Sequence, residues 1–199
     1  MQLRAPSIVL ATRAHGETAV IARMLTEAHG VVAGYVAGGR GRQLRPVVIP
    51  GNLVELQLSA RSDSQLPFAR LELVQSRGPW LREPLPAAAI GWASALTATA
   101  LPERQPYPRL YLALSGLLSA ICHAPSARGW ASALVGYETL LLRELGYGGG
   151  ERPRGDFEDV LAAMDRLAAP LDHYLLADRR GDVMAARARL RDLLNKIRE

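Results

Sequence analysis

Residues 35–45 read Tyr-Val-Ala-Gly-Gly-Arg-Gly-Arg-Gln-Leu-Arg, and apolar segments lie on both sides of them. The stretch holds three arginines, three glycines and one aromatic ring, and it holds no acidic residue. Guanidinium groups suit phosphate oxygens, and glycines allow a backbone to approach a polyanion closely. The stretch therefore predicts the phosphate-facing loop of a small β-rich module. The alternative is a solvated turn that happens to be basic.

Short apolar runs on both sides of this loop predict strands at residues 7–12, 30–37, 52–59 and 67–75. Residues 52–59 alternate, with Val54, Leu56 and Leu58 on one face. Residues 18–27 leave two alternatives open, because their pattern is typical of a helix while their position between two strands favours a strand. Five short strands within residues 1–79 predict a small closed barrel, which leaves no exposed sheet edge.

The composition changes at residues 77–86, where glycine and three prolines are typical of a linker. Longer segments rich in alanine and leucine follow, with apolar residues at helical spacing. We expect helices at residues 87–100, from 109 to 123, after Pro125 with Ser126 as N-cap, from Asp156 to Pro170, over 171–177 and after Asp182. The predicted organisation is α+β, with a barrel domain over residues 1–79 and an all-helical domain over residues 80–199.

The sequence predicts the environment of two groups of charged residues in the helical domain, the arginines of the last helix and Glu138. Arg187, Arg189, Arg191 and Arg198 fit the solvated face of an amphipathic last helix. Glu138 follows Tyr137 beside the apolar stripe of the third helix, where we expect it to pair with Arg143 or with an arginine from another helix.

The balance of charge favours an anionic partner. The formal net charge is +5, and residues 1–79 hold nine arginines against five acidic residues. The candidate DNA-binding residues are Arg13, Tyr35, Arg40, Arg42, Arg45 and Arg61. Tyr35 and Phe68 are the only rings of this region before Trp80, and we expect both to pack rather than stack on bases. Contact with the nucleic-acid backbone without sequence readout is therefore expected.

No constellation of residues indicates catalysis or a bound cofactor. The glycine runs at residues 38–41 and 148–150 do not fit a phosphate-binding loop, and the four histidines lack metal-ligand spacing. Cys122 is the only cysteine, which excludes an intramolecular disulfide. The sequence shows no signal peptide and no membrane-spanning segment, so a cytoplasmic protein that is not an enzyme is expected.

Several short phrases occur in a characteristic order over residues 7–148. They are Val9-Leu10, Arg13, His15-Gly16-Glu17, Leu25-Thr26-Glu27, His29-Gly30, Gly38-Gly39-Arg40-Gly41-Arg42, Leu101-Pro102-Glu103 and the aromatic-Glu-x-x-Leu-Leu-x-x-Leu-Gly segment that starts at Tyr137. In order and spacing they resemble the RecO family of bacterial recombinational-repair mediators. The resemblance implies an N-terminal OB-fold, in which residues 18–26 form a strand, and a helical C-terminal domain.

The resemblance also implies a function and partners. It implies binding of single- and double-stranded DNA in the nucleoid, annealing of complementary strands without a cofactor, and loading of recombinase onto coated single strands together with RecR. A further implied partner is the acidic C-terminal tail of the single-stranded-DNA-binding protein, for which Arg128, Tyr137 and Arg143 are the candidate residues. An RNA-binding OB module and a non-catalytic interaction scaffold remain the alternatives.

The sequence also departs from this family. Many relatives carry a zinc-finger-like insertion where this chain has residues 149–155 without a cysteine, so no zinc is expected. The chain is short at its C-terminus, which puts contacts made there in doubt. Val135 and Gly136 stand where relatives carry basic residues before the aromatic-Glu pair.

Overall fold

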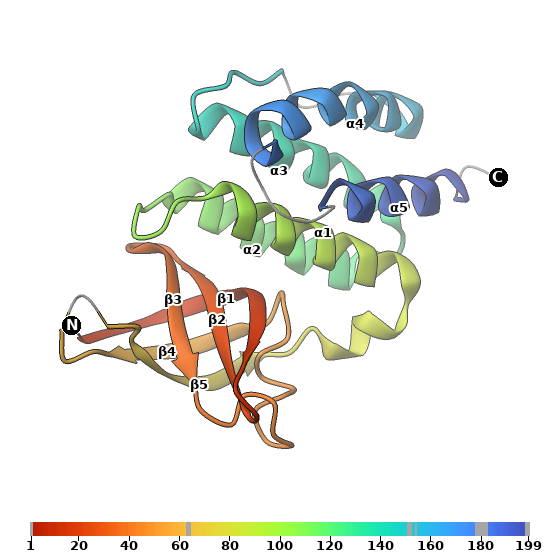
Figure 1. The fold of residues 1–199 in the computed structure, drawn as a ribbon. Helices are drawn as coiled ribbons and strands as arrows, with labels where there is room; N and C mark the ends of the chain where they lie inside the picture. The colour runs from red at the N-terminus through yellow and green to blue at the C-terminus, as the bar shows by residue number, and fades with distance from the viewer. Residues whose placement is uncertain (1, 63–64, 151–152, 154, 178–182, 198–199) are drawn as a thin grey trace. The chain divides into compact units, whose positions relative to one another are not determined.

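The computed structural model describes residues 2–62, 65–150, 153, 155–177 and 183–197 (Figure 1). The chain forms two compact units. The first comprises Met1–Arg82 together with Leu101–Pro108, and the second comprises Glu83–Ala100 and Arg109–Glu199. The first unit holds the strands and the second holds the α-helices. The functional domain bounds at residues 79 and 80 stay a prediction.

Five strands close into a barrel in the first unit, in the order β1-β2-β3-β5-β4. Every neighbouring pair is antiparallel except β3 and β5, which run parallel. The strands are β1 (Gln2–His15), β2 (Ala19–Thr26), β3 (Gly30–Val36), β4 (Leu53–Ser59) and β5 (Phe68–Gln75). The closed five-stranded barrel predicted from the sequence is therefore confirmed.

Strand β1 is long because it takes part in both halves of the barrel. Residues 2–8 pair with β4, and residues 7–15 pair with β2. The register with β2 shifts between Val9 and Ala11, so Leu10 is an extra residue that bends the strand from one partner to the other. The sequence predicted only residues 7–12 of this strand, because polar and small residues surround the apolar run.

Residues 18–27 have a sequence pattern typical of a helix, but the structure forms strand β2 there. Val20, Ala22 and Met24 point into the barrel core, while Leu25 on the opposite face is also buried. A strand that is apolar on both faces does not show the alternation that distinguishes strands in sequence. The strand implied by the family resemblance is therefore right, and the preference for a helix is wrong.

The barrel closes through a narrow seam between β3 and β5. Tyr35 is the only β3 residue paired with β5, opposite Phe68, and the Tyr35 amide donates to the carbonyl of Pro67 at 2.8 Å. Gly34 makes this approach possible, since a Cβ at that position would lie 2.7 Å from the Cβ of Ala69. Any larger residue would push the two strands apart.

The connection from β3 to β4 is tied to the barrel at its far end. Val47 and Val48 insert their side chains into the barrel core. The buried Asn52 amide donates to the carbonyls of Pro46 and Val47, at 2.9 and 3.0 Å. The arginine-rich stretch therefore lies in a loop with fixed ends.

The second unit is helical, as predicted. Its helices are α1 (Pro84–Ala100), α2 (Pro108–His123), α3 (Ala131–Glu144), α4 (Phe157–Leu171) and α5 (Val183–Asn195). Short helical turns are η1 (Gly78–Arg82), η2 (Ala127–Gly129) and η3 (Asp172–Leu176), of which η1 belongs to the first unit. In the described part of the chain, none of these segments has the length and apolar character needed to span a membrane.

The helix ends differ from the prediction in two places. Ser126 precedes η2 and makes no capping hydrogen bond with its side chain, and α3 begins five residues later. Pro170 does not end α4 but lies inside its last turn, and the expected helix over residues 171–177 continues as a π-helical turn. At the start of α4, Asp156 and Asp159 cap each other's backbone amides, as the acidic first turn predicts.

In the helical unit, the environment of Arg187 differs most from the prediction. It is 3% exposed, and its guanidinium forms two hydrogen bonds with the buried carboxylate of Glu138, at 2.8 and 2.9 Å. The same carboxylate accepts a bond from the Trp92 indole at 2.8 Å, and Arg187 also donates to the Met164 carbonyl. The solvated face predicted for Arg187 is wrong, whereas the pairing of Glu138 with an arginine from another helix is confirmed.

Candidate nucleic-acid interface

Arg40, in the loop that follows β3, is held by hydrogen bonds of its backbone and its side chain. Its backbone amide donates to the Thr18 carbonyl at 2.8 Å, and its Nη1 donates to the carbonyls of Glu17 and Gly16, at 3.0 and 3.4 Å. All three carbonyls belong to the turn between β1 and β2. The loop therefore packs on that turn, and the groups that hold the Arg40 side chain are neutral carbonyls, which do not offset its charge.

The other predicted arginines of the barrel face solvent. Arg42 and Arg45 lie on the same loop as Arg40, Arg13 lies near the end of β1, and Arg61 lies on a different loop, between β4 and β5. None of the described residues places a carboxylate within salt-bridge distance of these side chains. Exposed guanidinium groups of this kind are free to bind an incoming anion.

Three rings form a row on the outer surface of the barrel, which we call the aromatic row: His15, Tyr35 and Phe68. The His15 and Tyr35 rings meet edge to face at 5.7 Å, and the Tyr35 and Phe68 rings lie 5.0 Å apart with a tilt of 56°. The row crosses from β1 over β3 to β5, at the seam where the barrel closes.

Phe68 was not among the residues predicted for the site; its ring packs against Tyr35 on one side and is exposed on the other. Its side chain is 54% exposed, whereas the next residue, Ala69, lies in the barrel core. The signal was present in the sequence, because residues that alternate with buried Ala69 and half-buried Leu71 must face outward. Tyr35 is half-buried between its two ring neighbours.

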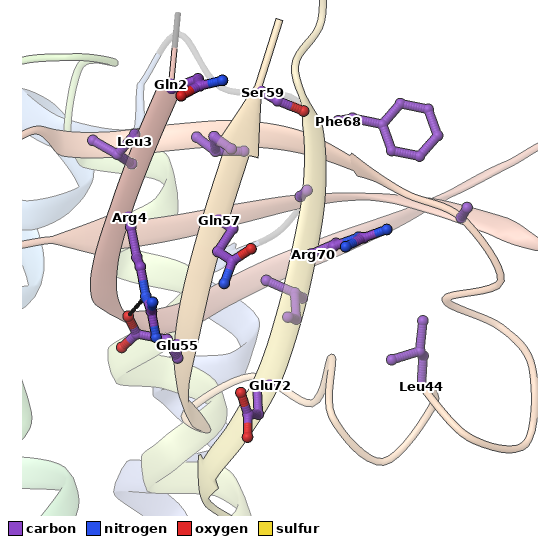
Figure 2. A pocket seen from close by; sticks show the side chains of 14 residues that line it. Gln2, Leu3, Arg4, Leu44, Glu55, Gln57, Ser59, Phe68, Arg70 and Glu72 are labelled. Carbon is purple, nitrogen blue, oxygen red and sulfur yellow. Dashed lines mark hydrogen bonds and ion pairs between the residues drawn. The ribbon is translucent and has the colours of Figure 1, made fainter.

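A groove of about 1100 Å³ begins beside Phe68 and runs over β5, β4 and β1 (Figure 2). Arg4 lies in it but is paired with Glu55 at 2.8 Å, which neutralises its charge. Arg70 projects from β5 on the same side as Phe68, and it has no carboxylate partner in the part of the chain described. The groove therefore offers the Arg70 guanidinium next to an exposed ring, with the Glu72 carboxylate two residues further along β5.

The described residues hold no cluster of three or more histidine, cysteine or carboxylate side chains that could bind a metal ion. The barrel surface presents cationic, aromatic and amide groups, together with the carboxylates of Glu55 and Glu72 in the groove. Of these, the cationic, aromatic and amide groups bind phosphates and the faces of planar rings.

The three residues predicted for a protein partner do not lie together. Tyr137 is 2% exposed, and its hydroxyl lies 2.5 Å from that of Thr97, so it offers no free surface. Arg128 precedes α3 and stacks over the Phe157 ring at 4.8 Å, while Arg143 lies in the last turn of α3 and donates to the Gly150 carbonyl. Fifteen residues of largely helical chain separate the two arginines by roughly 20 Å.

The chain matches two family models in sequence order. Residues 1–77 match the N-terminal model of recombination protein O, and residues 83–148 match the C-terminal model. Two curated relatives, both named DNA repair protein RecO, are similar over most of this chain. The relative from Phenylobacterium zucineum is 41% identical over 150 residues, which is 74% of this chain and 60% of the relative. The relative from Rhodospirillum centenum is 43% identical over 143 residues, which is 71% of this chain and 56% of the relative.

The chain thus spans about 60% of the length of the curated relatives it matches. The models and the structure agree on the fold class, which is an N-terminal OB-fold barrel followed by a helical C-terminal part.

Proposed function

The chain belongs to the RecO family, and from that premise we propose that its barrel binds DNA in recombinational repair. The relatives carry the name of a DNA repair protein, which supports a role in repair and recombination. The DNA-binding residues of the proposal are Arg13, Tyr35, Arg40, Arg42, Arg45 and Arg61.

The observation that carries the proposal is a set of exposed arginines without carboxylate partners among the described residues. Three of them lie on one loop that is anchored at both ends, so ordering the loop backbone on DNA costs little conformational entropy. Each guanidinium that contacts a phosphate releases condensed counterions, which makes the binding strong at low salt and weak at high salt.

Phosphate contacts of this kind do not distinguish single strands from duplex, so the barrel is proposed to bind both. Neutralising two strands lowers their repulsion, and the proposed consequence is annealing of complementary strands without nucleotide hydrolysis. Together with RecR, the protein is proposed to help load recombinase onto coated single strands. This role places it in the cytoplasm, associated with the nucleoid.

The helical unit is proposed to contact the acidic tail of the single-stranded-DNA-binding protein. Arg128 and Arg143 support this part because both side chains are exposed and carry a positive charge. Tyr137 is left out of the proposed contact, because its ring is enclosed by the helical unit.

The experiment that tests DNA binding compares two charge-reversal variants of equal net charge. The first changes Arg40, Arg42 and Arg45 to Glu, and the second changes Arg166, Arg189 and Lys196 to Glu, which are exposed residues of the helical unit. Fluorescence anisotropy with a labelled oligonucleotide and fluorescence-monitored annealing are the measurements. The first variant is expected to lose binding and annealing at moderate salt, and the second is expected to retain both.

Equal losses in the two variants would contradict a specific role for the loop and indicate a general effect of charge. Tighter binding of RNA than of DNA by the unchanged protein would favour an RNA-binding module. A wild-type protein that binds no nucleic acid at low salt would refute the proposed function.

A further inference from the structure

We propose that the aromatic row and the neighbouring groove hold the bases of an unpaired strand, with Tyr35 and Phe68 as the stacking residues and Arg70 as the next phosphate contact. This inference rests on the proposed function, in which the barrel binds DNA. It adds a specificity that arginine contacts lack, namely a preference for single strands over duplex.

The first observation is the exposure of Phe68. The side chain is 54% exposed although it belongs to a strand whose alternate residues enter the core. Closing the β3–β5 seam does not require this exposed face, because the Tyr35 amide already bonds to the Pro67 carbonyl there and Gly34 allows the close approach. The outer face of the ring is therefore available to a planar partner.

The second observation is the fixed geometry of the row. Tyr35 lies between His15 and Phe68, with ring contacts of 5.7 and 5.0 Å on its two sides. Two strands and the pairing of Tyr35 with Phe68 hold these rings in place before any ligand arrives. Stacking of a base on an aromatic side chain strengthens binding roughly tenfold to a hundredfold, and a rigid ring loses little freedom in the process.

The third observation is the polar surface that continues from Phe68 into the groove. Arg70 lies two residues further along β5, and the strand pairing sets Gln57 opposite Arg70 and Ser59 opposite Phe68. Figure 2 shows Phe68 and Arg70 projecting from the same side of β5. An amide and a hydroxyl can bond to the edges of exposed bases, and Arg70 can bind the phosphate that follows the stacked base.

The row also explains why a duplex would not use this site. Paired bases are already stacked on one another inside a duplex, so their faces are closed to a protein ring. A duplex can contact only the exposed arginines, whereas an unpaired strand can contact the arginines and the rings. The predicted difference between the two ligands is therefore set by Tyr35 and Phe68.

The first test uses the unchanged protein and two single strands of equal length and charge. One is oligothymidylate, and the other has the same sugar–phosphate backbone without bases. We expect oligothymidylate to bind at least tenfold more tightly, with the same slope of affinity against salt. Equal affinities would overturn the inference and leave phosphate binding by the arginines intact.

The second test changes the ring. Phe68→Ala is expected to lower the affinity for oligothymidylate about tenfold and to leave the affinity for duplex and the salt dependence unchanged. Phe68→Trp is expected to restore binding, with tryptophan fluorescence quenched by the stacked base. Val74→Ala is the matched control, because Val74 is an apolar residue of the same strand that is 58% exposed and lies outside the groove.

The outcomes separate this inference from the proposed function. Equal losses of single-strand and duplex affinity in Phe68→Ala would overturn the stacking role and assign Phe68 to barrel closure. If Phe68→Ala does not fold, Phe68→Leu and the comparison of strands with and without bases decide the matter. Absence of any DNA binding by the unchanged protein would refute the proposed function itself.

Discussion

The three arginines of the loop after β3 and two arginines of α5 have opposite environments. Arg40, Arg42 and Arg45 face solvent and meet no carboxylate among the described residues. In the helical unit, Arg187 is buried against Glu138, and Arg191 pairs with Asp165. The same residue type thus serves as an available charge in this loop and as a structural link between helices at Arg187 and Arg191.

Because some arginines are paired with carboxylates and others are not, the number of arginines does not indicate where the protein can bind an anion. Both units are rich in arginine, yet carboxylate partners neutralise Arg187 and Arg191 in the second. The distribution of acidic residues therefore decides which arginines remain available.

The largest effect is expected from breaking the buried pair. Glu138→Ala leaves the Arg187 guanidinium buried without its counter-charge, which costs about 3–5 kcal/mol of unfolding free energy. Urea unfolding followed by the fluorescence of Trp92 and Trp130 measures this loss. A double variant with methionine at both Glu138 and Arg187 is expected to recover most of the stability, since no charge is then left buried. A loss below about 1 kcal/mol in the single variant would mean that the pair is not buried in solution.

The next effect concerns the barrel and is expected in DNA binding rather than in stability. Changing Arg40, Arg42 and Arg45 to Gln is expected to lower single-strand affinity roughly tenfold to a hundredfold. The slope of log affinity against log salt should fall by about 2, because about 0.7 counterions are lost for each phosphate contact. The free energy of unfolding should stay within about 0.5 kcal/mol of the unchanged protein. A large loss of stability would show that these arginines are structural, like Arg187.

A third effect concerns the pH dependence of stability and is set by the buried hydroxyl of Tyr137. Burial raises the pKa of the Tyr137 hydroxyl well above its ordinary value, and the hydrogen bond with Thr97 lowers it in part. The folded protein therefore keeps a proton that the unfolded chain releases above about pH 10. The contribution of this hydroxyl to the free energy of unfolding is fully present below that pH. Above it, the free energy of unfolding should fall by about 1.4 kcal/mol per pH unit, until the folded-state pKa is reached. Urea titrations between pH 9 and about 11 test this, and the fall should be smaller in Tyr137→Phe.

The smallest effect is expected at the surface pair of Arg191 and Asp165. Asp165 is 57% exposed in its side chain, so solvent and salt screen the contact. Asp165→Asn is expected to cost about 0.2–1 kcal/mol, and the cost should shrink in high salt. The difference from Glu138→Ala measures how far burial, rather than contact distance, sets the value of an arginine pair. A cost as large as that of Glu138→Ala would remove this distinction.

Much of the barrel could be predicted because its strands carry their own signals. Val54, Leu56 and Leu58 alternate with polar residues, and the glycine- and arginine-rich loop separates two apolar runs. The pattern failed at β2, where both faces are apolar and no alternation exists. The exposed ring of Phe68 was missed because an aromatic residue in an apolar run was assumed to face the core.

The helical unit shows a second limit of sequence patterns. Arg187 comes four residues after Val183 and three before Leu190, so its spacing places it on the inward face of α5. The charge of the side chain led to the opposite expectation. Only the position of Glu138 on α3, beside α4 and α5, could have resolved the conflict, and that position depends on tertiary packing.

The segment Leu101–Pro108 affects how the isolated barrel can be produced. It follows α1 in sequence yet belongs to the barrel, where the Arg104 amide bonds to the Val31 carbonyl and Glu103 pairs with Arg23. A fragment that ends at Arg82 would lack the segment Leu101–Pro108, which we call the strap, and would uncover Val31. An expression plasmid for the isolated barrel should therefore encode the strap through a short engineered linker, and a protein made without it is expected to aggregate.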